Sequence, residues 1–146
     1  MKLLILNGPN LNMLGIREKH LYGAQTYEDF KRYILDKARD LNIDAEIYQS
    51  NHEGDLVDKI QSAYGEKDGI VINPAAYTHT SVAILDALKA VNLPAAEVHL
   101  TDITKREPFR QISYAGMACQ AHFMGLGFDG YGQALEWMKE HIEKPE

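Results

Sequence analysis

The chain has 146 residues, 45% of them hydrophobic and 25% charged, which is enough apolar material for one globular domain over residues 1–146. A formal net charge of −6 and a pI near 5.5 argue against broad binding to nucleic acid or to anionic membranes. We see no bilayer-length apolar run and no secretory signal pattern. The single cysteine, Cys119, excludes an intrachain disulfide, so a cytoplasmic protein is the simplest expectation.

Short apolar runs alternate with amphipathic helical patterns along the chain. Strands are predicted at 2–6, 44–49, 69–73, 94–100 and 118–124. Helices are predicted at 26–41, from a cap at Ser50 to near Gly65, at 81–91 and at 131–142. Thr26 and Asp29 have the spacing of a capping box, and Ser50 and Glu53 repeat it. The helix at 81–91 is expected to face inward through Val82, Leu85, Leu88 and Val91.

This alternation of strands and helices predicts right-handed crossovers and a parallel sheet with helices on both faces. Five strands favour an α/β flavodoxin-like three-layer sandwich with the strand order 2-1-3-4-5. In such sheets, ligands bind beyond the carboxyl ends of the strands. The residues that follow the first, third and fourth strands are therefore the candidates for a functional site.

Polar residues gather at those three places. Asn7, Asn10, Arg17 and Tyr22 follow the first strand, and Asn73 with residues 78–81 follows the third. The fourth strand carries Glu97, His99 and Thr101 on one face, because side chains alternate along a strand, and Arg106 and Arg110 come soon after. We therefore expect amide, imidazole, carboxylate, phenol and guanidinium groups to meet at one location.

Several of these residues have ordinary structural explanations that the sequence leaves open. The segment 7–10 has the composition of a simple turn, and residues 78–81 are suited to cap the helix that follows. Arg106 and Arg110 could be a solvated surface pair, and Arg17 and Tyr22 could belong to an ordinary exposed loop. His99 could be a satisfied core histidine, but Glu97 two residues away argues against this, because two adjacent ionisable groups are costly to bury without a purpose. We interpret His20, His52, His122 and His141 as surface or packing residues, because they lack metal-ligand spacing, and Cys119 as a core residue.

Other kinds of site lack their motifs. The sequence has no GxxxxGK[ST] or GxGxxG loop and no serine in a nucleophile elbow. A phosphoacceptor site would need acidic residues where Asn7 and Asn73 stand. A metal-free acid–base site remains, with Tyr22 beside Arg17 as base, His99 oriented by Glu97 as acid, Asn10 and Asn73 as donors, and an anion pocket at 78–81. This set suits proton abstraction next to a carbonyl with loss of a hydroxyl.

A family resemblance rests on motifs that run in order from Asn7 to about Tyr131. NGPNLNMLGIRE, QSNHEG, INPAAYTHTSVAI, EVHLTD, REPFR and GLGFDGY together resemble type II 3-dehydroquinate dehydratase, also called type II dehydroquinase. The resemblance implies a hydro-lyase without cofactor or metal that converts 3-dehydroquinate to 3-dehydroshikimate in the shikimate pathway of aromatic amino acid biosynthesis. It implies anti elimination through an enolate.

The resemblance also implies a role for each matching residue. Tyr22 is implied as the base, Arg17 as its activating partner, and Asn10 as the residue that holds a water at the enolate oxygen. His99 is implied as the acid, with Glu97 in its network. The implied substrate-binding residues are Asn73, His79, Leu100, Thr101, Arg110 and Asp86, the last reaching a neighbouring subunit's site in a dodecamer built as four trimers.

The sequence departs from the family pattern at Lys19, Leu85 and Gln111, where the family often has proline, a basic residue and histidine. Two other functions fit the same fold. One is a small-ligand binding module without catalysis, which would not need Arg17, Tyr22 and His99 together. The other is an assembly protein whose polar strand ends are interfaces. Turnover of 3-dehydroquinate distinguishes all three.

Overall fold

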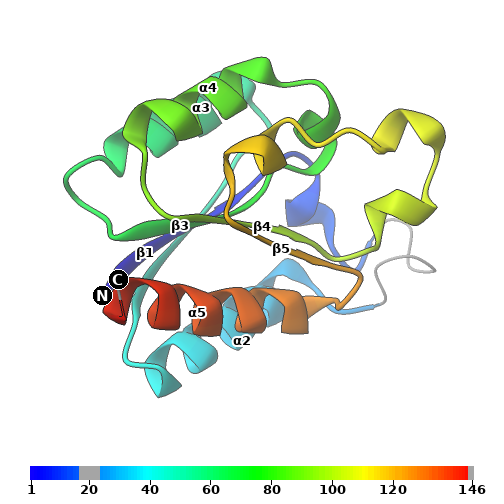
Figure 1. The fold of residues 1–146 in the computed structure, drawn as a ribbon. Coiled ribbons are helices and arrows are strands. Elements are labelled where there is room, and N and C mark those ends of the chain that lie inside the picture. Colours follow the sequence, from blue (N-terminus) through cyan, green and yellow to red (C-terminus); the bar gives the residue numbers. More distant parts are fainter. Residues whose placement is uncertain (17–23, 145–146) are drawn as a thin grey trace.

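The structure is a computed structural model that describes residues 1–16 and 24–144. Strands and α-helices alternate in it as far as β4, and the connection from β4 to β5 is built from short 3₁₀ helices instead of an α-helix (Figure 1). The strands are β1 (Lys2–Asn7), β2 (Asp44–Gln49), β3 (Gly69–Asn73), β4 (Ala95–His99) and β5 (Ala121–Met124). The α-helices are α2 (Tyr27–Asp40), α3 (Glu53–Ser62), α4 (Val82–Val91) and α5 (Phe128–Glu143). The 3₁₀ helices are η1 (Leu11–Met13), η2 (Ala75–His79), η3 (Ile103–Lys105), η4 (Pro108–Arg110) and η5 (Ala115–Ala118).

The strands of the described chain form one parallel sheet in the order β2-β1-β3-β4-β5. Helices α2 and α5 cover one face of this sheet, and α3 and α4 cover the other (Figure 1). The predicted α/β flavodoxin-like three-layer sandwich and its strand order are confirmed. The chain order reverses between β1 and β3, and ligands of such sheets bind beyond the carboxyl ends of the strands at this point.

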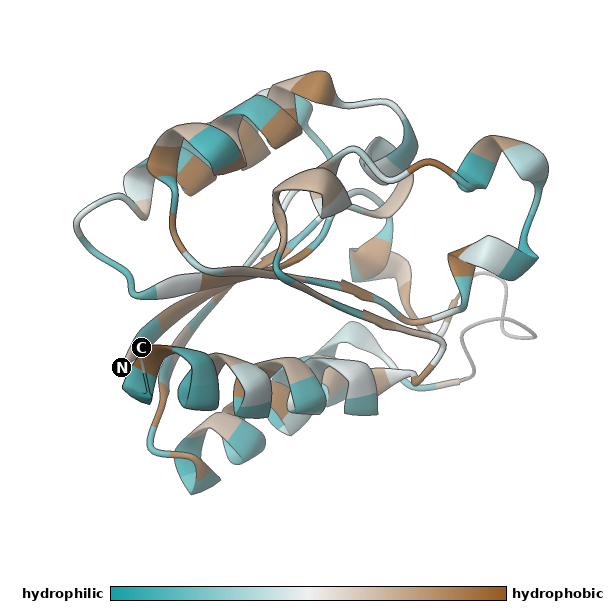
Figure 2. Ribbon diagram, in the orientation of Figure 1, coloured by the Kyte–Doolittle hydropathy of each residue, from teal (hydrophilic) through white to brown (hydrophobic). Residues whose placement is uncertain are grey.

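The core lies on both faces of the sheet because successive side chains of a strand point to opposite sides. Leu3 and Ile5 of β1 pack on the α2–α5 side, whereas Leu4 and Leu6 pack on the α3–α4 side. The first side also contains Phe30, Ile34, Tyr131, Leu135 and Met138, and the second contains Leu56, Ile60, Ile84 and Leu88. The helices accordingly show hydrophobic and hydrophilic bands (Figure 2).

The two expected capping boxes have different outcomes. The box at the start of α2 is confirmed: the Asp29 amide donates to Thr26 Oγ1 at 3.1 Å, and the Thr26 amide donates to Asp29 Oδ2 at 2.9 Å. The box expected from Ser50 and Glu53 is wrong. Helix α3 begins at Glu53, so His52 occupies the cap position, and Ser50 Oγ instead accepts from the His52 amide at 3.0 Å.

Three boundaries or faces also differ from the prediction. Val82 is 49% exposed rather than inward, because at about 100° per residue it lies opposite the buried stripe of α4. Strand β5 begins at Ala121 rather than 118, because residues 115–118 form η5, and α5 begins at Phe128 rather than 131. None of the helices within the described ranges is both long and apolar enough to cross a membrane.

Candidate active site

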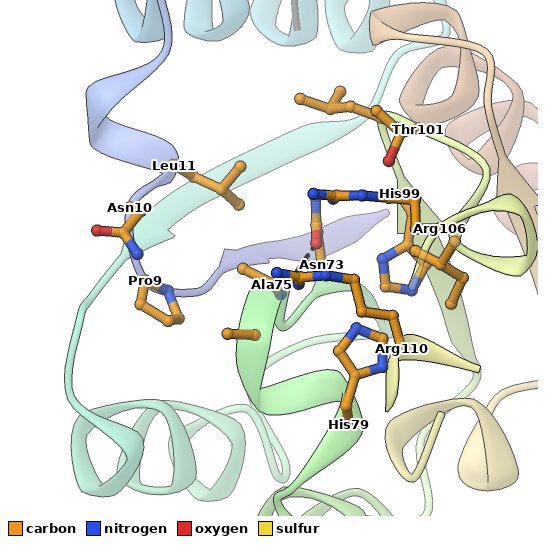
Figure 3. A pocket seen from close by; sticks show the side chains of 13 residues that line it. Pro9, Asn10, Leu11, Asn73, Ala75, His79, His99, Thr101, Arg106 and Arg110 are labelled. Carbon is orange, nitrogen blue, oxygen red and sulfur yellow. Dashed lines mark hydrogen bonds between the residues drawn. The ribbon is translucent and has the colours of Figure 1, made fainter. Parts of the chain in front are cut away.

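A cavity of about 150 Å³ lies beyond the carboxyl ends of β1, β3 and β4, where the sequence predicts the site (Figure 3). It is lined by Pro9, Asn10, Leu11, Asn73, Ala75, Ala76, His79, His99, Leu100, Thr101, Ile103, Arg106 and Arg110. Among these are seven of the residues that the resemblance marks. The structure therefore brings together most of the predicted site.

The loop after β1 is held in place by the end of β2. Gln49 Nε2 donates to the Gly8 carbonyl at 3.1 Å, and Asn51 Oδ1 accepts from the backbone amide of Asn10 at 3.0 Å. Asn10 itself has φ of 70°, a left-handed conformation that asparagine tolerates better than most residues. These contacts fix the backbone that presents Asn10 to the cavity.

The end of β3 presents Asn73, and the 3₁₀ helix η2 that follows presents His79. Asn73 is 3% exposed, and its Oδ1 accepts from the Ala75 amide at 3.0 Å. His79 Nδ1 lies 2.8 Å from the carbonyl oxygen of Ile112. Since a carbonyl only accepts, Nδ1 carries the proton, and Nε2 of the neutral ring is an acceptor.

The charge of His79 is set by its surroundings. Burial lowers its pKa, and the hydrogen bond to the Ile112 carbonyl opposes this effect. Positive charge at His99, Arg110 and Arg106 lowers it further. A neutral His79 is therefore favoured beside the two guanidinium groups.

His99 and Glu97 form a buried pair at the end of β4. Glu97 is fully buried and His99 is 4% exposed, and His99 Nε2 lies 2.7 Å from Glu97 Oε2. Both side chains emerge from one face of the strand, as their spacing predicts. Because a carboxylate only accepts, Nε2 carries a proton, and Nδ1 is the ring nitrogen left to face the cavity.

Glu97 is held as an anion by its neighbours. Burial raises the pKa of its carboxyl, but hydrogen bonds and positive charge outweigh burial and hold the pKa at about 2. The donors are His99, Ser113 Oγ, and His122, whose Nδ1 lies 2.7 Å from Glu97 Oε1. His122 lies at the surface, as interpreted from the sequence, but its hydrogen bond to Glu97 was not predicted. Only the pairing of β5 with β4 places it on this carboxylate.

The loop after β4 supplies the cationic side of the cavity. The side chains of Arg106 and Arg110 are 14% and 24% exposed, so they are not a fully solvated surface pair. Arg110 Nε donates to Glu107 Oε1 at 2.9 Å. Gln111 Nε2 donates to the carbonyl oxygens of Ile103 and Arg106 at 3.2 and 3.0 Å, which braces the same loop. Two guanidinium groups on one wall suit an anionic ligand.

Of the other predicted site residues, some fall outside the described ranges and some lie away from the cavity. Tyr22 and Arg17 lie outside the described residues, as does Lys19. Asp86 is exposed on α4 and does not line this cavity. Ser81 is the N-cap of α4, its Oγ accepting from the Ile84 amide at 2.9 Å, as the capping interpretation predicts. Of the segment 78–81, His79 is the residue that lines the cavity.

Two other candidate groups have structural roles. Asn7 is fully buried: its Oδ1 accepts from Tyr131 Oη at 2.7 Å, and its Nδ2 donates to Tyr27 Oη at 3.3 Å. Burial, with a smaller effect of the Glu97 charge, raises the pKa of the Cys119 thiol to about 12, so a thiolate nucleophile is disfavoured. Within residues 1–16 and 24–144, no cluster of three histidine, cysteine or acidic side chains is arranged to hold a metal ion.

Comparison with known families decides the class of the chain. Residues 1–139 match the family model described as dehydroquinase class II. The chain belongs to the class II dehydroquinases. The family covers the whole sheet and every residue that lines the cavity.

Individual class II dehydroquinases resemble the chain over nearly its full length. The 3-dehydroquinate dehydratase of Caldicellulosiruptor bescii is 52% identical over 143 residues, covering 97% of this chain and 99% of the relative. That of Clostridium acetobutylicum is 47% identical over 144 residues, covering 99% and 100%. The crystal structure of the type II dehydroquinase from Butyrivibrio crossotus is 49% identical, with a TM-score of 0.93 over 94% of this chain and 97% of that one. The relatives' names describe a hydro-lyase.

Proposed function

We propose that this class II dehydroquinase removes water from 3-dehydroquinate to give 3-dehydroshikimate, by a metal-free anti elimination through an enolate. The observation that carries the proposal is the buried Glu97–His99 pair, which lies at a cavity that Arg106 and Arg110 also line. An acid for the leaving hydroxyl and positive charge that favours an anionic substrate are two features that the reaction needs at one location.

The first step of the proposed reaction is proton abstraction. Tyr22, ionised with the help of Arg17, takes a proton from the carbon next to the ketone, and the electron pair of that C–H bond moves to the carbonyl oxygen as an enolate. Neither residue belongs to the described part of the chain. Asn10, on the cavity wall, holds a water that donates a hydrogen bond to the enolate oxygen.

The second step is loss of the hydroxyl. The enolate re-forms the ketone, its electrons form the carbon–carbon double bond, and the hydroxyl departs with the proton of His99 Nδ1 as water. The Glu97 carboxylate on His99 Nε2 stabilises the protonated imidazole and fixes the ring. One proton goes to Tyr22 and one comes from His99, so the net change is the loss of one water molecule.

Substrate binding uses the remaining walls of the cavity. Arg110 supplies charge, and Asn73 and His79 supply hydrogen-bonding groups for the hydroxyls of the substrate. The backbone at Leu100 and Thr101 holds the carboxylate.

Addition of 3-dehydroquinate to the purified chain tests the proposal. The conjugated enone of the product should appear in the ultraviolet spectrum, and the product should be 3-dehydroshikimate by NMR. Activity should persist after treatment with a chelator. Binding without turnover would support the ligand-binding module instead, and neither binding nor turnover would support the assembly protein.

The proposal extends to assembly and location. Residues 1–146 would act as one domain in a dodecamer built as four trimers, within the cytoplasm and in the shikimate pathway. Asp86, exposed on α4 away from its own cavity, would reach a neighbouring subunit's site. Light scattering should give the mass of twelve chains, and Asp86→Ala should lower activity or change that mass. A fully active monomer would contradict this part.

A further inference from the structure

The carboxylate of Glu97 has a second imidazole that the proposed reaction does not use. Oε2 accepts from His99 Nε2 at 2.7 Å and from Ser113 Oγ. Oε1 accepts from His122 Nδ1, also at 2.7 Å. Two histidines therefore share one buried carboxylate, one on each oxygen. One of them lines the cavity, and the other has a side chain that is 44% exposed.

The sheet makes this arrangement rigid. Glu97 and His122 are register partners across the parallel pair β4–β5, so their side chains leave the sheet side by side on the same face. The backbone of η5 closes over the carboxylate, because a Cβ on Gly116 would lie only 2.6 Å from Glu97 Oε1. Ser113 Oγ in turn accepts from the Gly116 amide at 3.0 Å. The backbone of η5 limits the carboxylate on one side, and its orientation is held by the donors on its two oxygens.

A buried carboxylate with both oxygens engaged stays in one orientation. If Oε1 lost its donor, its buried lone pairs would be unsatisfied, and the group would gain by rotating toward water or by drawing the shared donors away. Either change would move His99, whose ring position Oε2 sets. General acid catalysis is sensitive to small displacements of the acid from its productive position.

We propose that His122 is a positioning residue for the dehydration: it fixes the Glu97 carboxylate and, through it, the ring of the acid His99. This inference rests on the proposed function and extends it. His122 does not line the cavity, so it acts without touching the substrate.

The test compares three variants by steady-state kinetics and urea unfolding. His122→Leu removes the donor, and His122→Asn restores one, because an asparagine Nδ2 lies close to the place of the histidine Nδ1. His141→Leu is the control, because His141 is exposed on α5 and stacks on Trp137 at 4.6 Å. Leucine at 122 should lower kcat by about tenfold with KM unchanged. Asparagine should recover most of kcat, and the control should match the wild type.

Two results would overturn the inference while the proposed function stands. The first is a wild-type kcat in His122→Leu. The second is a kcat of His122→Leu that falls in proportion to its loss of urea stability, together with a kcat of His122→Asn that is no higher. A wild-type chain without dehydratase activity would instead refute the proposed function.

A measurement without substrate tests the positioning itself. In solid-state ¹⁵N NMR of the histidine-labelled chain at a pH where the rings are neutral, Nδ1 of His122 and Nε2 of His99 should carry the protons. In His122→Leu the His99 signals should shift, and in His141→Leu they should not. An unprotonated Nδ1 at His122, or His99 signals unmoved by His122→Leu, would refute the inference whatever the activity.

Discussion

Gly8 and Pro74 approach so closely that a Cβ on Gly8 would lie 2.2 Å from the carbonyl oxygen of Pro74. The Gly8 amide also donates to the carbonyl oxygen of Asn73 at 2.8 Å. These contacts join the loops that leave β1 and β3, next to the cavity-lining residues Pro9 and Asn73. The spacing between Asn10 and Asn73 therefore depends on the absence of a side chain at position 8.

Gly8→Ala should destabilise the chain and impair the site. The backbone of Pro74 must move to admit a methyl group, which we expect to cost roughly 1–3 kcal/mol in the free energy of unfolding. Gly54→Ala is the control: Gly54 lies exposed in α3 with no atom within 4 Å of an added Cβ. Alanine there should stabilise the helix by roughly 0.5–1 kcal/mol. Urea unfolding measures both, and equal effects would contradict the argument.

His99→Ala should fold but lose nearly all turnover. Hydroxide is a poor leaving group without an acid, and general acid catalysis is typically worth roughly 10²–10⁴-fold. The loss should appear in kcat, measured by product absorbance, while the unfolding curve confirms a folded chain. Near-wild-type kcat in a folded variant would remove His99 from the proposed role.

Tyr22→Phe should abolish turnover, and Arg17→Ala should shift its pH dependence. A phenol in water ionises near pH ~10, and a nearby cation favours the phenolate. Without the Arg17 charge, the rise in rate that reports ionisation of the base should move to higher pH. Arg17→Lys should fall between, because it keeps the charge but loses the planar fork. A pH–rate profile unmoved by Arg17→Ala would assign the activation of Tyr22 to another group.

Glu97→Gln should change stability in a pH-dependent way. The pKa of Glu97 is about 2 in the folded chain against an ordinary value of 4.5, so its carboxylate stabilises the fold above pH 4.5. This contribution is lost as the pH falls from 4.5 toward 2, and it is worth about 3 kcal/mol at most. The wild type should exceed the variant in urea stability at pH 7, and the gap should narrow between pH 5 and pH 3. A gap that stays constant would contradict the assignment.

Local patterns determined most of the fold from the sequence alone. The alternation of apolar runs and helical faces predicted every strand, because each strand depends on residues close in the chain, and the general preference of five-stranded parallel sheets then predicted the strand order. The capping box at Thr26 and the shared face of Glu97 and His99 are equally local, since they follow from helix geometry and from the period of two in a strand. The place of the cavity followed from the sheet order.

The tertiary structure decided what depends on contacts between distant segments. The bond between Glu97 and His122 joins residues 25 apart and exists only because β5 pairs with β4 in one register. Likewise, the approach of Gly8 to Pro74 joins loops more than sixty residues apart. A sequence records the periodicity of each element. The register between elements is set by how the side chains of the whole core pack together, and no local pattern contains that information.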